Sequence, residues 1–234
     1  TKLYKFIVYN NNTYKANIKF VDLGADDGNA GILDGSEVYW SYADGVLTVT
    51  GKGIAKIDNP NGVSHDQLIP WIKAGHKNEI KKLVISEGIT GTSAPAKIFG
   101  DLPNLEEVIL PDSFTTLGTG CFANTKLTSV VLGENVINFD TVTFSGCMDL
   151  KTLVVKNRTM NVAESAWCSD PDTNPLARIP ENLTVYGYRF TDENKTVETK
   201  LYKFIVYNNN TYKANIKFVD LDADALDGLQ LNYD

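Results

Sequence analysis

A short apolar pattern recurs through the middle of the chain and constrains its fold more than any other feature. In four stretches, apolar residues occupy the first, fourth and sixth positions. These stretches begin at residues 80, 105, 127 and 150, and a related one begins at residue 183. They read IKKLVIS (80–86), LEEVILP (105–111), LTSVVLG (127–133), LKTLVVK (150–156) and LTVYGY (183–188). A unit repeated at this interval predicts a stack of similar coils, each contributing one strand.

The segments that connect these strands repeat as well. Each carries an apolar residue early and an aromatic residue late, namely Ile89, Phe114 and Val136, then Phe99, Phe122 and Phe144. We therefore expect an irregular or short helical return leg whose aromatic side chain points inward. Spacings of 20–29 residues are typical of leucine-rich repeats, in which stacked neighbours share one core. The wider last interval indicates an insertion within residues 157–182, which include Trp167 and Cys168.

Several motifs resemble the BspA-type leucine-rich repeat, whose pattern is approximately I-P-x-S-V-T-x-I-G-x-x-A-F-x-G-C-x-x-L-x-S-V-x-I. LPDSFTTLG (110–118) matches its first part and FSGCMDL (144–150) matches F-x-G-C-x-x-L. WSYADGVLTVTGKGIAKI (40–57) resembles the opening hairpin of the family. Two departures are Cys121, where the family usually has Ala, and FANTK (122–126) in place of F-x-G-C. The resemblance covers about residues 36–190 and implies a leucine-rich repeat fold.

The two ends of the chain carry one 23-residue segment twice. TKLYKFIVYNNNTYKANIKFVDL occupies residues 1–23 and again residues 199–221, identical at every position. Alternating side chains in LYKFIVY and TYKANIKFV predict two antiparallel strands, with NNN as the turn between them. A lone hairpin is marginal in water, so each copy is expected to pack on something.

Three explanations of this duplication stay open. The parent protein could be a tandem array that repeats every 198 residues. Both copies could instead belong to one domain as a reused motif, or the duplication could be artificial. Different sequences, GADDGNAG and DADALDGL, follow the two copies, which favours motif reuse over simple tandem duplication.

The predicted architecture is an α/β repeat solenoid, rich in β-structure, with a short stack of irregular leucine-rich coils and β-hairpin caps at both ends. Residues 1–35 form the N-terminal flank and residues 36–190 the repeat domain. Within that domain the opening hairpin is expected at 36–58 and the coils at 78–190. Residues 191–234 form the C-terminal flank, which holds the second hairpin at 199–221.

Composition excludes several classes of function. The net charge is −7 and the longest basic run is Lys81–Lys82, so the chain lacks the clustered basic residues of nucleic-acid-binding proteins. No stretch approaches the ~20 apolar residues that a membrane-spanning helix requires. Cys121, Cys147 and Cys168 show no metal-binding spacing and are expected to be free, buried thiols.

Candidate chemistry is sparse. His65 and His76 lie in no metalloprotease or nucleophile-elbow motif, so we expect neither an enzyme nor a cofactor. Asp220, Asp222 and Asp224 resemble the start of a calcium loop, but Ala225 and Leu231 replace the glycine and glutamate of an EF-hand. A solvated acidic turn is the simpler interpretation.

Aromatic residues are the other candidates for binding. Trp40, Trp71, Tyr186 and Tyr188 could stack on a sugar or anchor a protein partner. They also lie near the two ends of the predicted stack, where large side chains would be needed as plugs, and plugging is the interpretation that we favour.

The resemblance implies a secreted or cell-wall-attached bacterial protein that adheres to a protein or glycan on a host or neighbouring cell. A solenoid surface suits such a macromolecular partner, so a protein-interaction or adhesion module is the first hypothesis. A structural spacer within a tandem-array surface protein and a carbohydrate-binding module are the alternatives. The repeated hairpin additionally suggests self-association.

Overall fold

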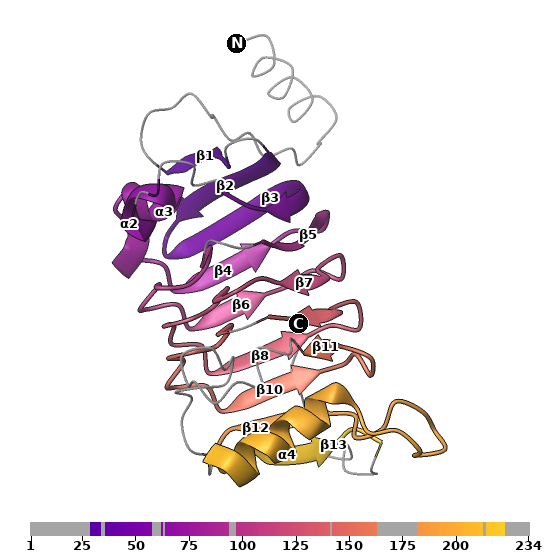
Figure 1. The fold of residues 1–234 in the computed structure, drawn as a ribbon. Helices are drawn as coiled ribbons and strands as arrows, with labels where there is room; N and C mark the ends of the chain where they lie inside the picture. The colour runs from indigo at the N-terminus through magenta and orange to yellow at the C-terminus, as the bar shows by residue number, and fades with distance from the viewer. Residues whose placement is uncertain are drawn as a thin grey trace.

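The computed structural model describes residues 29–33, 36–57, 62, 64–93, 97–140, 142–162, 182–212 and 214–222. Its strands lie one above another along a single axis, as Figure 1 shows, so the chain forms a β-rich repeat fold. The first copy of the duplicated segment (1–23) lies outside the described residues, as does most of the insertion, including Trp167 and Cys168.

An antiparallel sheet opens the stack, as the sequence predicts. β1 (Ala30–Ile32) pairs with β2 (Glu37–Ala43), and β2 pairs with β3 (Val46–Ala55). Asp44 and Gly45, with φ of 49° and 83°, form the tight turn between β2 and β3, and such paired positive values suit the right-handed twist of a hairpin. The opening hairpin is therefore confirmed.

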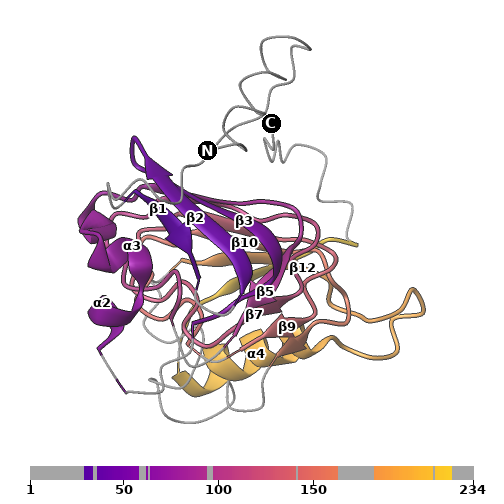
Figure 2. The same cartoon turned by 90° about the horizontal axis from the view of Figure 1, so that it is seen from above.

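β3 starts two parallel sheets at once. Its first half pairs with β4 (Lys82–Ile85), and its second half pairs with β5 (Ile89–Thr92). Two short helices, α2 (His65–Leu68) and α3 (Pro70–Lys73), and the 3₁₀ turn η1 (His76–Asn78) connect β3 to β4 along one side of the stack (Figures 1 and 2). The next three coils then each add one strand to both sheets.

The front sheet contains the strands that the apolar pattern predicts. β4 pairs with β6 (Glu107–Ile109), and a second ladder joins β8 (Ser129–Leu132), β10 (Thr152–Val155), β12 (Thr184–Gly187) and β13 (Lys217–Asp220). All of these pairings are parallel. β6 and β8 are neighbours in the stack, although no ladder joins them (Figure 1).

The return legs differ from the expectation of irregular or helical structure. They form a back sheet in which β5, β7 (Thr116–Leu117), β9 (Asn138–Phe139) and β11 (Asn161–Val162) pair in parallel. Three of these strands are only two residues long. A two-residue strand shows no alternation that a sequence pattern could detect.

Buried side chains fill the space between the sheets. In the strands beginning at 80, 127 and 150, every residue of the predicted apolar pattern is buried. In the strand beginning at 105, Leu105 is buried, whereas Val108 and Leu110 are partly buried against the core beside the break between β6 and β8.

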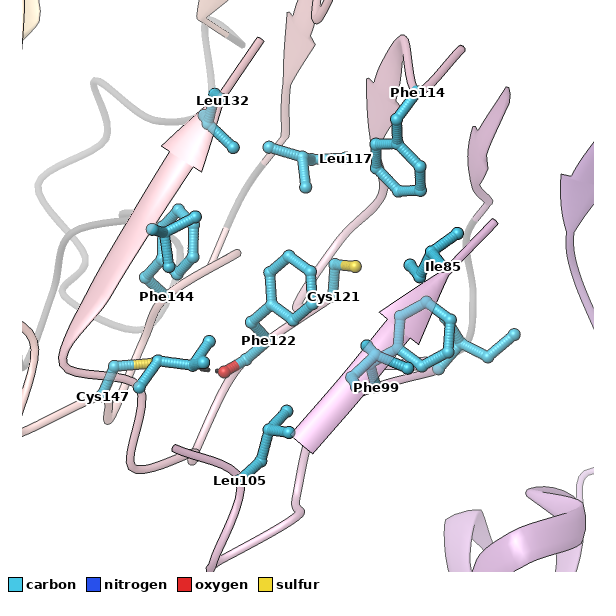
Figure 3. Close-up of a cluster of buried hydrophobic side chains, with 14 of the residues drawn as sticks. Ile85, Phe99, Leu105, Phe114, Leu117, Cys121, Phe122, Leu132, Phe144 and Cys147 are labelled. Atoms are coloured by element: carbon cyan, nitrogen blue, oxygen red, sulfur yellow. Dashed lines mark hydrogen bonds between the residues drawn. The ribbon is translucent and has the colours of Figure 1, made fainter. Parts of the chain in front are cut away.

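Aromatic side chains form a continuous column through this core. Trp71, Phe99, Phe122 and Phe144 stack in succession, with ring centroids 5.7, 6.2 and 5.8 Å apart and planes within 20° of parallel. Figure 3 shows the three phenylalanines in a row, each from a different coil. Offset-stacked rings at this distance are favourable beyond their burial, so the column ties each coil to the next.

The position two residues after each of these phenylalanines has a left-handed backbone conformation, and these positions form a second column. Asp101, Asn124 and Gly146 occupy this position with φ of 56°, 57° and 76°. Only glycine, and to a lesser degree Asn and Asp, adopts this left-handed conformation readily. FANTK therefore keeps the backbone of F-x-G-C, with Thr125 at the position that Cys147 occupies in the next coil, and the two side chains lie 3.3 Å apart.

The second copy of the duplicated segment is not a hairpin. It forms helix α4 (Lys200–Tyr212) followed by strand β13. Leu201, Phe204, Ile205 and Asn208 are buried, which is a helical spacing, whereas Val206 is 38% exposed. Asn208, Asn209 and Asn210 lie within α4 and do not form the predicted turn. The predicted hairpin cap is thus wrong at the C-terminal end, where a helix and a strand close the stack.

We expect Phe122→Ala to lower the free energy of unfolding by ~3–5 kcal/mol, because it leaves a cavity between two stacked rings. Met148→Ala is the matched control, since Met148 lies one coil away and is 57% exposed; its effect should stay within ~0.5 kcal/mol. Urea denaturation followed by circular dichroism measures both. Equal effects of the two substitutions would contradict a stabilising role of the aromatic column.

Candidate interaction surface

The outward face of the front sheet carries one apolar residue per strand. Val84 is paired with Ile109, Val131 with Val154, Val154 with Tyr186, and Tyr186 with Val219. Side chains alternate along a strand, so these six point away from the core that their neighbours fill. We call them the apolar row: Val84, Ile109, Val131, Val154, Tyr186 and Val219.

Exposure varies along the apolar row. Ile109 is 44% exposed, Val154 is buried at 1%, and the other four are partly exposed. Apolar side chains that remain at a surface and are aligned on paired strands form an apolar strip across each ladder. Such strips on monomeric proteins commonly mark contact sites for other molecules.

A polar row runs beside the apolar one, two residues earlier on each strand. It comprises Lys82, Glu107, Ser129, Thr152, Thr184 and Lys217. Lys82 and Glu107 form an ion pair of 2.8 Å across adjacent strands. An apolar centre with a polar margin is the usual composition of a protein–protein interface.

The C-terminal end of this face holds an aromatic and charged cluster. The Arg158 guanidinium lies 3.8 Å from the centre of the Tyr188 ring, and its two terminal nitrogens bind the carboxylate of Asp222 at 2.6 and 2.5 Å. Hydrogen bonding to Arg158 lowers the pKa of Asp222, and the same contact raises the pKa of Arg158. Arg158 thereby joins the fourth coil to the end of β13.

This pairing bears on the candidate calcium residues. Asp222 is engaged by Arg158, and Asp220 accepts hydrogen bonds from the backbone N–H groups of Arg189 and Asp222, each at 3.2 Å. Asp224 lies outside the described residues. Within the described part of the chain, no group of three potential ligands could hold a metal ion.

The four candidate aromatic residues divide into two pairs. Trp40 is 5% exposed and Trp71 is fully buried, with their rings 5.9 Å apart, edge to face. Their rings pack at the opening of the stack and offer no surface to a partner, so this pair is withdrawn as binding candidates. Tyr186 and Tyr188 are partly exposed and remain candidates.

Sequence reasoning missed the rest of the apolar row. The fifth position of each of the first four strand motifs is apolar, as Val84, Ile109, Val131 and Val154 show. A buried strand of this kind needs apolar residues only at the fourth and sixth positions. An additional apolar residue at the fifth position was therefore the sequence signal for an outward-facing apolar row.

Among the described residues, the two histidines, Cys121 and Cys147 do not form a catalytic arrangement. His65 Nε2 lies 2.9 Å from the carbonyl of Lys97, while His76 stacks on Tyr42 and binds Glu79 at 2.8 Å. Cys121 and Cys147 are free and buried, as expected. Burial raises the pKa of Cys121 to about 12 and also raises the pKa of Cys147. A thiol in such a setting is a core residue, not a nucleophile.

The back sheet has a shallow groove of about 270 Å³, lined by Thr116, Leu117, Asn138, Phe139, Asp140 and Asn161. Its polar groups are already engaged: Asp140 accepts a hydrogen bond from Thr119, and Asn161 accepts one from Lys200. Phe139 is buried and presents no ring face for a sugar. No described helix is long and apolar enough to cross a membrane.

A family model for the BspA type leucine-rich repeat region matches residues 75–198, in six copies. The match covers more than half of the chain. The chain belongs to the BspA-type leucine-rich repeat family. No curated protein matches the chain.

Three solved structures are similar to this BspA-type chain. A leucine-rich repeat protein from Eubacterium ventriosum is 21% identical with a TM-score of 0.42, over 54% of this chain and 37% of that one. One from Bacteroides ovatus is 13% identical with a TM-score of 0.36, over 61% and 32%. The pneumococcal vaccine antigen PcpA is 19% identical with a TM-score of 0.39, over 80% and 48%. The chain thus spans less than half the length of each.

Both described thiols should be unreactive in the folded protein. In a Cys168→Ser variant, a thiol reagent at pH 8 should modify Cys121 and Cys147 only after denaturant is added, because burial keeps the pKa of each raised. Mass spectrometry of native and unfolded samples measures this. Rapid labelling of the native protein would show that the core opens readily.

The ion pair of Arg158 and Asp222 predicts a defined pH dependence. The folded pKa of Asp222 is lowered, so the pair stabilises the fold above the unfolded pKa of ~3.9 and loses this effect as the pH falls through the lower folded value. Asp222→Asn should cost up to ~1 kcal/mol at pH 7, since the pair is partly exposed. Urea unfolding at pH 7 and below pH 3 tests this; a cost that persists in acid would contradict it.

Proposed function

We propose that this chain is an extracellular or cell-surface protein-interaction module that binds a macromolecular partner through the apolar row of its front sheet. The observation that carries the proposal is the row itself. Its members come from six strands, and the pairing registers align Val84 with Ile109 in one ladder and Val131, Val154, Tyr186 and Val219 in the next. Burying such a row against a partner would contribute roughly 25 cal/mol per Å² of apolar surface.

Three features support a protein as the partner. The polar row gives the apolar strip a hydrogen-bonding margin on one side. Tyrosine is among the residue types enriched at the centre of protein interfaces, and Arg158, another such type, lies over the Tyr188 ring. The row crosses several coils and therefore suits a macromolecule better than a small ligand. The extracellular setting is the one that the family resemblance implies, and adhesion is the proposed role.

Two other functions remain as alternatives. A spacer in a surface protein would need no partner for the apolar row. A carbohydrate-binding module would use exposed rings, and Tyr186 and Tyr188 are the candidates for it on the described surface.

Ile109→Glu should abolish binding to a protein partner without changing stability by more than ~0.5 kcal/mol, because Ile109 is the most exposed member of the apolar row. The matched control is Ile137→Glu, since Ile137 is 50% exposed but lies beside β9 of the back sheet. Surface plasmon resonance against purified matrix and mucosal proteins provides the measurement, with circular dichroism as the check on folding.

The same experiment separates the alternatives. Saturable binding that Ile109→Glu removes and Ile137→Glu keeps supports the proposal. A spacer predicts no saturable partner for the unaltered chain, whereas a carbohydrate-binding module predicts signals on a glycan array that Tyr186→Ala or Tyr188→Ala removes.

A further inference from the structure

The C-terminal end of the stack is covered by the second copy of the duplicated segment. Leu201, Phe204, Ile205 and Ile216 are buried there, over the last coil. A Cβ atom placed on Gly187 of β12 would lie 2.9 Å from Leu201 Cδ2, so the helix rests directly on that strand. We call residues 199–221 the cap.

Polar contacts also hold the cap in register. β13 extends the front sheet by donating from the N–H groups of Lys217 and Leu221 to Leu183 and Gly187, at 2.9 and 2.8 Å. The Thr199 hydroxyl donates to the Tyr188 carbonyl at 2.7 Å and accepts from the N–H of Tyr202. Every cap residue in these contacts belongs to the duplicated segment.

The first copy offers the same groups. Thr1, Leu3, Phe6, Ile7 and Ile18 correspond to Thr199, Leu201, Phe204, Ile205 and Ile216, and the 23 residues are identical throughout. A surface that binds one copy of a sequence has the same contacts available for the other. The end of the stack is therefore complementary to residues 1–23 as well.

Residues 1–23 cannot reach the end of their own stack. β1 and the site of β13 are separated by eight strand-to-strand steps, which is about 38 Å at ~4.8 Å each. From Asp22, the counterpart of Asp220, to Ala30 in β1 there are eight residues, which span at most ~29 Å when fully extended. The occupant must come from another molecule.

We propose that the C-terminal end of the stack binds residues 1–23 of a second copy of this chain, which replace the cap and join the copies head to tail. The proposal does not depend on the apolar row, since it uses the end of the stack and not its face. Exchange of an identical element between protomers is an established way to form such contacts.

The resident cap has two advantages over the incoming segment. It is tethered, so its effective concentration is roughly millimolar. It is also followed by Asp222, which binds Arg158, whereas the first copy is followed by Gly24. The unexchanged form therefore dominates in dilute solution, and exchange increases when the chains are concentrated or the cap is weakened.

The test uses the full chain in three forms. Leu201→Ala with Phe204→Ala weakens the resident cap while residues 1–23 stay intact. The matched form adds Leu3→Ala and Phe6→Ala, the corresponding changes in the first copy. Sedimentation velocity over a range of concentrations should show that the cap-weakened form associates. The form changed in both copies should stay monomeric, and the unaltered chain should associate less than the cap-weakened form. If the cap-weakened form is monomeric, or if both forms associate equally, the proposal is wrong.

A second measurement covers the case in which the weakened form folds poorly. A synthetic peptide of residues 1–23 should raise the melting temperature of the cap-weakened chain, and a peptide with Leu3→Ala and Phe6→Ala should not. In the unaltered background, Asp222→Gly should increase binding of the labelled peptide roughly two- to fivefold, because it removes one ion pair of the resident cap. Equal effects of the two peptides would overturn the proposal.

A disulfide trap tests the placement. Tyr186 is paired with Val219, whose counterpart is Val21. A cap-weakened chain with Tyr186→Cys, mixed with a chain carrying Val21→Cys, should yield an intermolecular disulfide between these positions. The Cα atoms of paired residues on adjacent strands lie within the separation that a disulfide can span. Mass spectrometry that finds no such linkage would contradict the exchange.

Discussion

The structure depends on contact between equivalent buried side chains of adjacent coils. One coil of about 23 residues cannot enclose its own apolar residues, and each becomes buried only when the next coil covers it. The stacking of Phe99, Phe122 and Phe144 shows the principle most directly, because the same position repeats in three coils at nearly constant separation. Such an arrangement has two open ends, and both must be covered by something that is not another coil.

The two ends are covered in different ways. At the start, an antiparallel hairpin feeds both sheets, and Trp40 and Trp71 fill the space beneath it. At the other end, α4 lies over the last coil while β13 extends the front sheet. The two caps differ because the first and the last coil leave different groups uncovered. The first coil needs strands to pair with, and the last needs a broad apolar side as well as one more strand.

The sequence predicted the repeats and the opening hairpin well and the C-terminal cap poorly. The spacing of Leu83, Val130 and Leu153 identified the front strands, because each is an inward residue in a strand long enough to show the pattern. The back strands were missed because two residues show no period. The cap was predicted as a hairpin because Tyr202, Phe204 and Val206 alternate, although Leu201, Phe204 and Ile205 equally fit one face of a helix. Packing on the last coil decided between the two periods.

The candidate surface was predicted only in part. Tyr186 and Tyr188 were named from residue type, while Trp40 and Trp71 were named for the same reason and are buried. Residue type alone does not tell a plug from a contact residue, since both are large and aromatic. Ile109 could have been found from its position between inward neighbours, which marks it as an outward apolar side chain.

The left-handed column of Asp101, Asn124 and Gly146 has a consequence for aligning repeats of this kind. Leucine, isoleucine and valine substitute freely for one another in the core, so the apolar pattern alone leaves the boundaries of a degenerate coil ambiguous. A position with φ near 60° admits very few residue types. A Gly, Asn or Asp two residues after a phenylalanine therefore locates each coil even where the apolar pattern is degenerate, as in the irregular coil that contains Asp101.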